Sequence, residues 1–256
     1  MLLFFTPVDY KMKKAILLCY HGSKDLEGSA DTKRLTKTFQ KKNKNITIKY
    51  GYLQNAEPSI NDQLNTLLKK NFYRIMIIPG MIFSGNHVTK DIPKIINKFQ
   101  KENKQVKISI SLPLIKLKNF FSLIKKNINS KIKKIKKNNK TILILIASNT
   151  LNVEAKKEMK DVLKKIALIY YFKNSKIIMI GSKSSALKKK LLNLNKMGYT
   201  KFVVLPFLLF RGLLLKNCSN VVDSIKKSNK NINCILLPHL NNYKIISEFL
   251  TKSIIF

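Results

Sequence analysis

The chain has 256 residues, 45% of them hydrophobic, and it carries a formal net charge of +37 at pH 7. This length and composition suit a globular protein of one or two domains. No apolar run approaches the ~18 residues that span a bilayer, and the apolar start of the chain breaks at Thr6 and Pro7, so we expect neither a membrane partner nor a signal peptide.

Short apolar runs alternate with segments of helical periodicity along the whole chain. Apolar residues at helical spacing include Leu35 with Phe39 and Ile60 with Leu64, and Pro58 is expected in the first turn of the second of these helices. The runs rich in Ile, Val and Leu predict strands at residues 14–20, 46–53, 73–78, 106–112, 141–147, 175–180, 201–206 and 232–237. This alternation predicts an α/β fold of two doubly wound lobes with parallel sheets.

The second half of the chain repeats the plan of the first at a constant offset. In this frame Pro79 corresponds to Pro206, His21 to Ser148 and His87 to Leu214. An internal duplication in which one copy lacks both histidines indicates a site built on the histidines of the other copy. The repeat predicts an N-terminal extension, a catalytic lobe, a lysine-rich linker and a degenerate second lobe, at residues 1–12, 13–130, 131–140 and 141–256.

The positive charge has two possible sources. Lysine-rich surfaces bind nucleic acids by releasing counterions from phosphates. However, only Arg34, Arg74 and Arg211 are arginines, whereas a protein that reads phosphates or bases is expected to keep more arginine for bidentate contacts. Lysine, asparagine and isoleucine share A/T-rich codons, so we favour genome composition and expect no specific nucleic-acid partner. The positive field would still attract a polycarboxylate substrate.

The cysteines indicate a reducing compartment. Cys19, Cys218 and Cys234 show no paired spacing, which argues against a zinc knuckle and a disulfide framework. Buried small side chains are the simplest interpretation. We therefore expect a cytoplasmic protein, or one of an organelle stroma if an organelle encodes it.

Two histidines follow strands that can be neighbours in a doubly wound sheet. His21 comes directly after the first predicted strand, and His87 lies beyond the third. Ligands of open α/β sheets bind beyond the carboxyl ends of the strands, where two imidazoles could hold a divalent metal or accept a proton. From spacing alone each could also be a lone loop histidine. Ser23 could cap the next helix or hold an anion, and we expect His239 to be structural or peripheral.

Three segments occur in one order, at Tyr20–Asp25, Gly51–Ile60 and Pro79–Pro93. Together they resemble the class II chelatases, the sirohydrochlorin cobaltochelatase and ferrochelatase family of CbiX and SirB type, in its long two-lobe form. The resemblance covers nearly the whole chain. It implies insertion of Co²⁺ or Fe²⁺ into sirohydrochlorin, in cobalamin or sirohaem biosynthesis, with the metal as substrate and with no ATP or other cofactor.

The resemblance also implies roles for individual residues. It makes His21 the catalytic base and a metal ligand, and His87 the second metal ligand. Neutral histidine can take a pyrrole proton and bind a dication near pH 7. The residues implied to line the tetrapyrrole are Glu57, Ile82, Phe83, Ser84, Gly85, Asn86 and His87.

One residue departs from the family pattern. Many members have an acidic residue where this chain has Gln54, which can neither take a proton nor neutralise a metal. Gln54 is therefore only a possible site residue. The alternative function is a carrier that binds metal or tetrapyrrole without catalysis.

Overall fold

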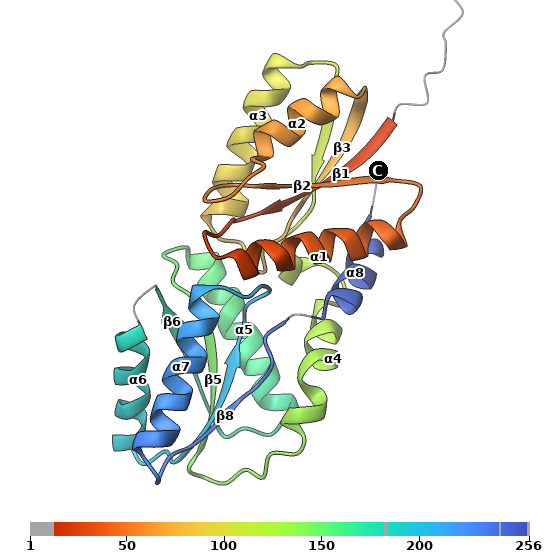
Figure 1. The fold of residues 1–256 in the computed structure, drawn as a ribbon. Coiled ribbons are helices and arrows are strands. Elements are labelled where there is room, and N and C mark those ends of the chain that lie inside the picture. Colours follow the sequence, from red (N-terminus) through yellow and green to blue (C-terminus); the bar gives the residue numbers. More distant parts are fainter. Residues whose placement is uncertain (1–12, 182–183, 241, 255–256) are drawn as a thin grey trace, which may run out of the picture.

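The protein consists of two α/β lobes placed end to end (Figure 1). The computed structural model describes residues 13–181, 184–240 and 242–254, so the extension predicted at residues 1–12 lies outside the described residues. Each lobe contains a four-stranded parallel sheet.

The first half of the chain has the strand order β2-β1-β3-β4. In chain order its elements are β1 (Lys13–Tyr20), α1 (Leu26–Lys42), β2 (Thr47–Tyr52), α2 (Ile60–Lys69), β3 (Phe72–Pro79), the π-helical turn η1 (His87–Asp91), α3 (Ile92–Glu102), β4 (Lys107–Ile110), the 3₁₀ turn η2 (Leu114–Lys116) and α4 (Phe120–Ile132).

The second half has the equivalent strand order, β6-β5-β7-β8. Its elements are β5 (Thr141–Ser148), α5 (Val153–Ile169), β6 (Asn174–Ile180), α6 (Ser184–Lys196), β7 (Lys201–Pro206), α7 (Leu213–Ser228), β8 (Asn233–Leu236) and α8 (Tyr243–Thr251). Every run predicted as a strand forms one, and the matching sheet orders confirm two similar doubly wound α/β lobes.

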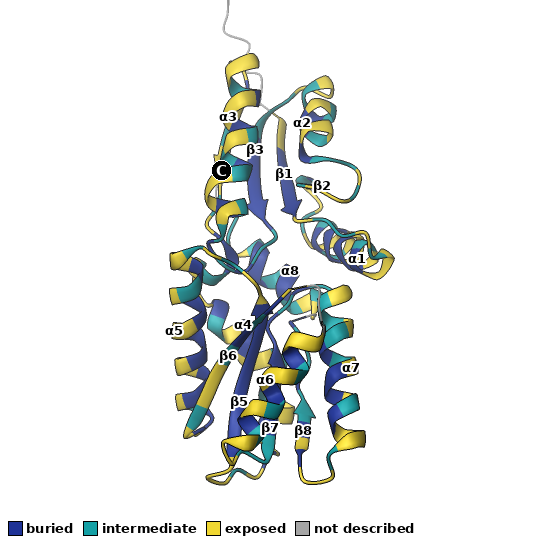
Figure 2. Ribbon diagram, turned by 90° about the vertical axis from the view of Figure 1, so that its left-hand side faces the viewer, coloured by how far each residue is buried: buried dark blue, intermediate teal, exposed yellow. Residues whose placement is uncertain are grey.

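Alternate residues of the central strands face opposite layers of helices. Ile16 and Leu18 of β1 belong to a hydrophobic cluster with α1, whereas Ala15 and Leu17 pack with α2 and α3. Figure 2 shows these central strands as buried, with exposed residues on the outer faces of the helices. Burial on both faces explains why the strands read as continuous apolar runs.

The last helix of each half crosses to the other lobe (Figure 1). Helix α4 lies against α5, where Tyr170 donates a hydrogen bond of 3.2 Å to Asn129. Helix α8 lies against α1, where Lys42 pairs with Glu248 at 3.2 Å. One hydrophobic cluster therefore runs through both lobes. The boundaries at residues 130 and 140 stay predictions, and within the predicted linker Ile135 is buried.

Two helix starts differ from the sequence predictions. Helix α2 begins at Ile60 with Ser59 as N-cap in a reciprocal capping box, so Pro58 precedes the helix instead of lying in its first turn. The N-cap of α1 is Asp25. Ser23 does not cap the helix and instead accepts a hydrogen bond of 3.0 Å from the Asp25 amide.

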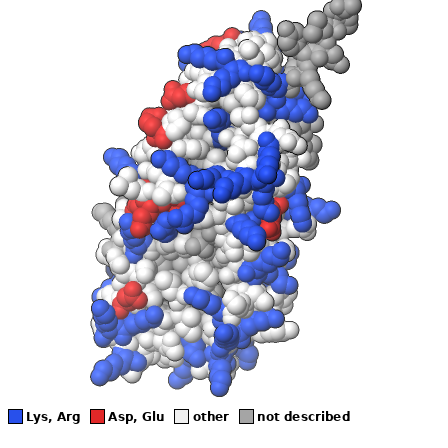
Figure 3. Space-filling model, turned by 45° about the vertical axis from the view of Figure 1, so that its right-hand side comes forward, with Lys and Arg blue, Asp and Glu red and all other residues white. Residues whose placement is uncertain are grey.

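The surface charge does not gather over one element. Figure 3 shows lysine and arginine side chains spread over both lobes of one face, with few acidic groups between them. The three cysteines are buried and unpaired, as predicted. Within the described ranges, no helix has the length and apolar character needed to cross a bilayer.

Candidate active site

The fold brings His21 and His87 together at one edge of the first sheet. Strands β1 and β3 are parallel neighbours, with Cys19 opposite Pro79, so the chain leaves both strands at the same edge. The two imidazole rings lie 4.8 Å apart between centroids, at an interplanar angle of 69°. The prediction that the two strand ends are neighbours is confirmed.

The hydrogen bonds of His21 define its neutral tautomer. Its Nδ1 atom lies 2.8 Å from the carbonyl oxygen of Gly22. A carbonyl oxygen only accepts, so Nδ1 carries the proton and Nε2 keeps its lone pair. Gln54 donates from its amide nitrogen to that Nε2 atom at 3.1 Å. The hydrogen bond from Gln54 therefore engages the lone pair of His21 Nε2, the atom through which this ring could bind a metal.

A tight backbone crossing holds Gln54 beside His21. The Gln54 amide donates to the His21 carbonyl oxygen at 3.1 Å. Gly22 has a φ of +91°, and a Cβ atom on it would overlap the Gln54 carbonyl oxygen. Only glycine meets both requirements at this turn, so the residue after His21 is needed for the geometry of the site.

His87 is oriented by Asp91, a residue that the sequence reasoning missed. Its Nδ1 atom lies 2.6 Å from Asp91 Oδ2. The carboxylate accepts a hydrogen bond from Nδ1–H, so the lone pair of the neutral His87 ring is on Nε2, an arrangement found behind many metal-binding histidines. The spacing of four residues at the start of a helix was the available signal.

The paired rings thus offer two imidazole Nε2 donors. Among the residues that the structure describes, no group of three or more His, Cys, Asp or Glu side chains could hold a metal ion. Structural metal sites have more protein ligands than this. A pair of ligands suits an ion that is bound briefly and passed on.

The loop before His87 is partly turned into the protein. Ile82 and Ser84 are buried, at 8% and 2% exposed. The Phe83 ring stacks on Phe207 of the second lobe, with 5.4 Å between centroids. The side chains of Ile82 and Ser84, both implied to line the tetrapyrrole, therefore face the interior.

The remaining predicted substrate residues divide into two groups. Gly85 borders open space, since a Cβ atom there would meet nothing within 4 Å, and the exposed Asn86 accepts a hydrogen bond of 3.0 Å from Asn152. Glu57 is exposed before α2. Within the described chain no hydrogen bond or ion pair joins Glu57 to either histidine, so the structure does not bring it into the pair.

The second-lobe counterparts form no such pair. Ser148 is exposed at the end of β5, and Leu214 is half-buried on α7, where it packs against the core of its own lobe. The candidate site therefore belongs to the first lobe.

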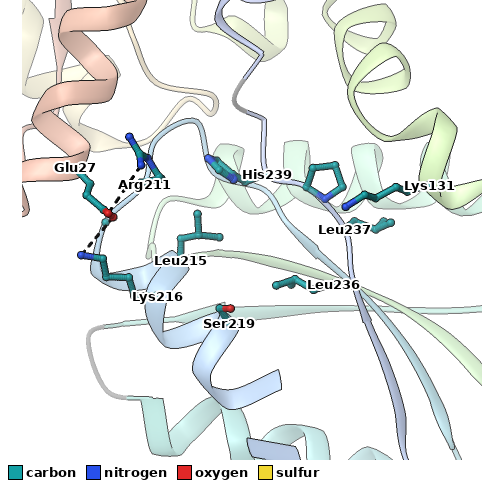
Figure 4. Close-up of a pocket in the computed structure, with 11 residues that line it drawn as sticks. Glu27, Lys131, Arg211, Leu215, Lys216, Ser219, Leu236, Leu237 and His239 are labelled. Atoms are coloured by element: carbon teal, nitrogen blue, oxygen red, sulfur yellow. Dashed lines mark ion pairs between the residues drawn. The ribbon is translucent and has the colours of Figure 1, made fainter. Parts of the chain in front are cut away.

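A separate pocket of about 370 Å³ lies at the strand ends of the second lobe (Figure 4). It contains neither His21 nor His87. Its lining residues are Glu27, Lys131, Arg211, Gly212, Leu215, Lys216, Ser219, Leu236, Leu237, Pro238 and His239. Burial lowers the pKa of His239, and its Nε2 atom has no partner among the described residues. Its structural or peripheral role stays a prediction.

Two cations of this pocket, Arg211 and Lys216, form ion pairs between the two lobes. Arg211 donates from Nη2 to the buried Asp31 carboxylate at 2.6 Å and from Nε at 3.0 Å. Lys216 pairs with Asp25 at 3.0 Å and with Glu27 at 3.4 Å. Burial raises the pKa of Asp31, but the Arg211 hydrogen bonds outweigh it and leave the pKa below its usual value. These ion pairs join α1 and its N-cap to the start of α7 and the loop before it.

Comparisons with known proteins place this chain in a family. A family model described as CbiX matches residues 15–131 and 142–255. Among the similar proteins, a sirohydrochlorin ferrochelatase of Priestia megaterium is 23% identical over 85% of this chain and 80% of its own length. A sirohydrochlorin cobaltochelatase of the same organism is 22% identical over 86% of this chain and 72% of its own length.

Solved structures share the fold. The sirohydrochlorin chelatase SirB from Bacillus subtilis subspecies spizizenii, solved in complex with cobalt, superposes with a TM-score of 0.72. The match covers 94% of this chain and 93% of that one, at 19% identity. This likeness extends over both lobes.

Proposed function

The chain belongs to the CbiX family, and from this premise we propose that it is a sirohydrochlorin chelatase that inserts Co²⁺ or Fe²⁺ into the macrocycle. The names of its relatives support this substrate. The observation that carries the proposal is the pair of imidazoles, 4.8 Å apart, at the strand ends of the first lobe.

The chemistry follows from what the two rings offer. Insertion removes pyrrole N–H protons and transfers a partly desolvated dication. In the proposed reaction the Nε2 atoms of His21 and His87 bind the substrate metal. As the metal leaves, Nε2 of His21 becomes the acceptor for the two pyrrole protons, which it takes one after the other, and the exposed ring releases each of them to water. Asp91 holds the His87 ring in position.

The proposed reaction needs no ATP, because the macrocycle offers more nitrogen donors than the two imidazoles that deliver the ion. The excess of lysine attracts the peripheral carboxylates of sirohydrochlorin. We place the activity in the cytoplasm or an organelle stroma, an assignment that the unpaired cysteines support.

A direct assay tests the proposal. Purified protein mixed with sirohydrochlorin and Co²⁺ or Fe²⁺, without ATP, should produce the absorbance change of metallation faster than a mixture without protein. Tight binding of both substrates with no acceleration would reject the chelatase and leave the carrier.

The carrier is kept as a second candidate because of one observation. Gln54 donates a hydrogen bond to the lone pair of His21 Nε2, which a metal must displace. A protein that only stores metal or tetrapyrrole could tolerate this competition, whereas a chelatase has to break the bond in each turnover.

Gln54→Glu should leave the insertion rate equal or higher. A carboxylate cannot donate to His21, and it attracts a dication by about 1 kcal/mol per unit charge at ~4 Å in water. We expect the metal concentration for half-maximal rate to fall by up to roughly tenfold, measured by steady-state metallation. Asn55→Asp, which adds the same charge at the next exposed position, is the matched control. A slower Gln54→Glu enzyme would contradict this account of Gln54.

A further inference from the structure

A buried carboxylate of the second lobe holds the loop that leads to His87. Glu158 lies on α5 and is 8% exposed. Ser84 of the first lobe donates to it twice, from its backbone nitrogen to Oε2 at 2.7 Å and from its hydroxyl to Oε1 at 2.5 Å. Hydrogen bonds to an ionised acceptor are about twice as strong as neutral ones. Ser84 is therefore held through both its main chain and its side chain.

The surroundings of Glu158 favour this contact. The Lys116 ammonium lies 3.5 Å from Glu158 Oε1 and 3.0 Å from Glu154 Oε1. It supplies the opposite charge that a buried carboxylate requires. One turn earlier on the same helix, Glu154 is exposed, and among the described residues the hydrogen bonds of Ser84 to α5 go to Glu158 and not to Glu154. Glu154 is therefore a natural comparison.

The held loop runs directly into the helix that carries His87. The Gly85 carbonyl oxygen accepts from the amides of Val88 and Thr89, both at 3.0 Å, so the residue after Ser84 is the first acceptor of the turn η1. A side chain at Gly85 would meet nothing nearby. The polar side-chain contacts of this segment with the second lobe therefore come from α5 and its N-cap, through Glu158 and the bond between Asn152 and Asn86.

We infer that Glu158 is a positioning residue of the metal site, acting from the second lobe through Ser84 on the ring of His87. This inference rests on the proposed function, because it assigns the second lobe a part in metal binding at the site of the first lobe. It also explains why the side chain of Ser84 is turned away from the loop's open side.

The test measures Co²⁺ binding to the full chain by the visible absorption of the bound ion, with circular dichroism to confirm folding. Glu158→Gln should weaken Co²⁺ binding about tenfold, the lower end of the effect of partners that orient metal-binding histidines. Glu154→Gln, the matched control, should stay within about twofold of the unsubstituted protein. Equal affinities in the two variants would overturn the inference.

A second arm separates positioning from general loss of structure. In a His87→Ala background, Glu158→Gln should have no further effect on Co²⁺ affinity, because its route to the metal is gone. A tenfold effect that persists there would overturn the inference. If Glu158→Gln does not fold, Ser84→Ala takes its place. It should weaken Co²⁺ binding about threefold, and this effect should also disappear in the His87→Ala background. Unchanged Co²⁺ affinity in Ser84→Ala would overturn the inference. Failure of the unsubstituted protein to insert metal rejects the proposed function but leaves this binding comparison intact.

Discussion

Replacing His21 with alanine should lower the rate of metal insertion by at least ~10²-fold, the usual scale for loss of a general base. The change removes one of the two imidazole rings that lie at the strand ends, and with it the proposed metal ligand and proton acceptor. Steady-state metallation rates of folded variants measure the effect.

The duplication supplies the control for this experiment. Ser148→Ala alters the corresponding position of the second lobe, which is exposed and has no role in the site, so its rate should match the unsubstituted protein. His87→Ala should mainly weaken metal use, and raised metal concentration should partly restore the rate. If His21→Ala and Ser148→Ala behave alike, the site is not at the histidine pair.

Arg211→Ala should destabilise the protein by about 3 kcal/mol, near the lower end for a buried ion pair that loses one partner. Asp31 is 0% exposed, and the change removes its hydrogen bonds to Nε and Nη2 while keeping the one to the residue 211 amide. Urea unfolding measures the loss. Lys216→Ala, which breaks pairs across the same junction in which the lysine is half exposed, should change stability by less than about 1 kcal/mol. Equal losses of stability in Arg211→Ala and Lys216→Ala would show that the burial of Asp31 does not cause the loss in Arg211→Ala.

The same ion pair predicts a dependence on pH. The folded pKa of Asp31 lies below the usual value of 3.8, so the unfolded chain binds the proton first as the pH falls. The stabilisation of the folded protein by the ionised Asp31 is therefore present above pH ~4 and is lost as the pH drops through the lowered pKa. Unfolding free energies of the unsubstituted protein and of Arg211→Ala should differ at pH 7 and converge in acid. A difference that stays constant down to pH 3 would contradict this origin.

The elements and the duplication could be predicted because they depend on local pattern. Continuous apolar runs such as Ile142–Ala147 are recognisable as strands buried on both faces, and the constant offset between the halves predicts two equal sheets. The proximity of His21 and His87 to each other could also be predicted from the sequence, because the carboxyl ends of parallel strands meet at one edge of the sheet. The resemblance to the family came from three segments, which lie at the ends of the first, second and third strands.

The contacts that complete the site depend on how distant segments pack. Ser84 and Glu158, like Asp31 and Arg211, are joined only because the lobes meet in one orientation, and no periodicity within either half carries that information. The packing of α4 and α8 against the opposite lobe also could not be predicted from local sequence. An amphipathic helix specifies an apolar face but not the partner that covers it. Local sequence thus determined the elements and the histidine pair, whereas the tertiary structure decided which side chains of the second lobe support them.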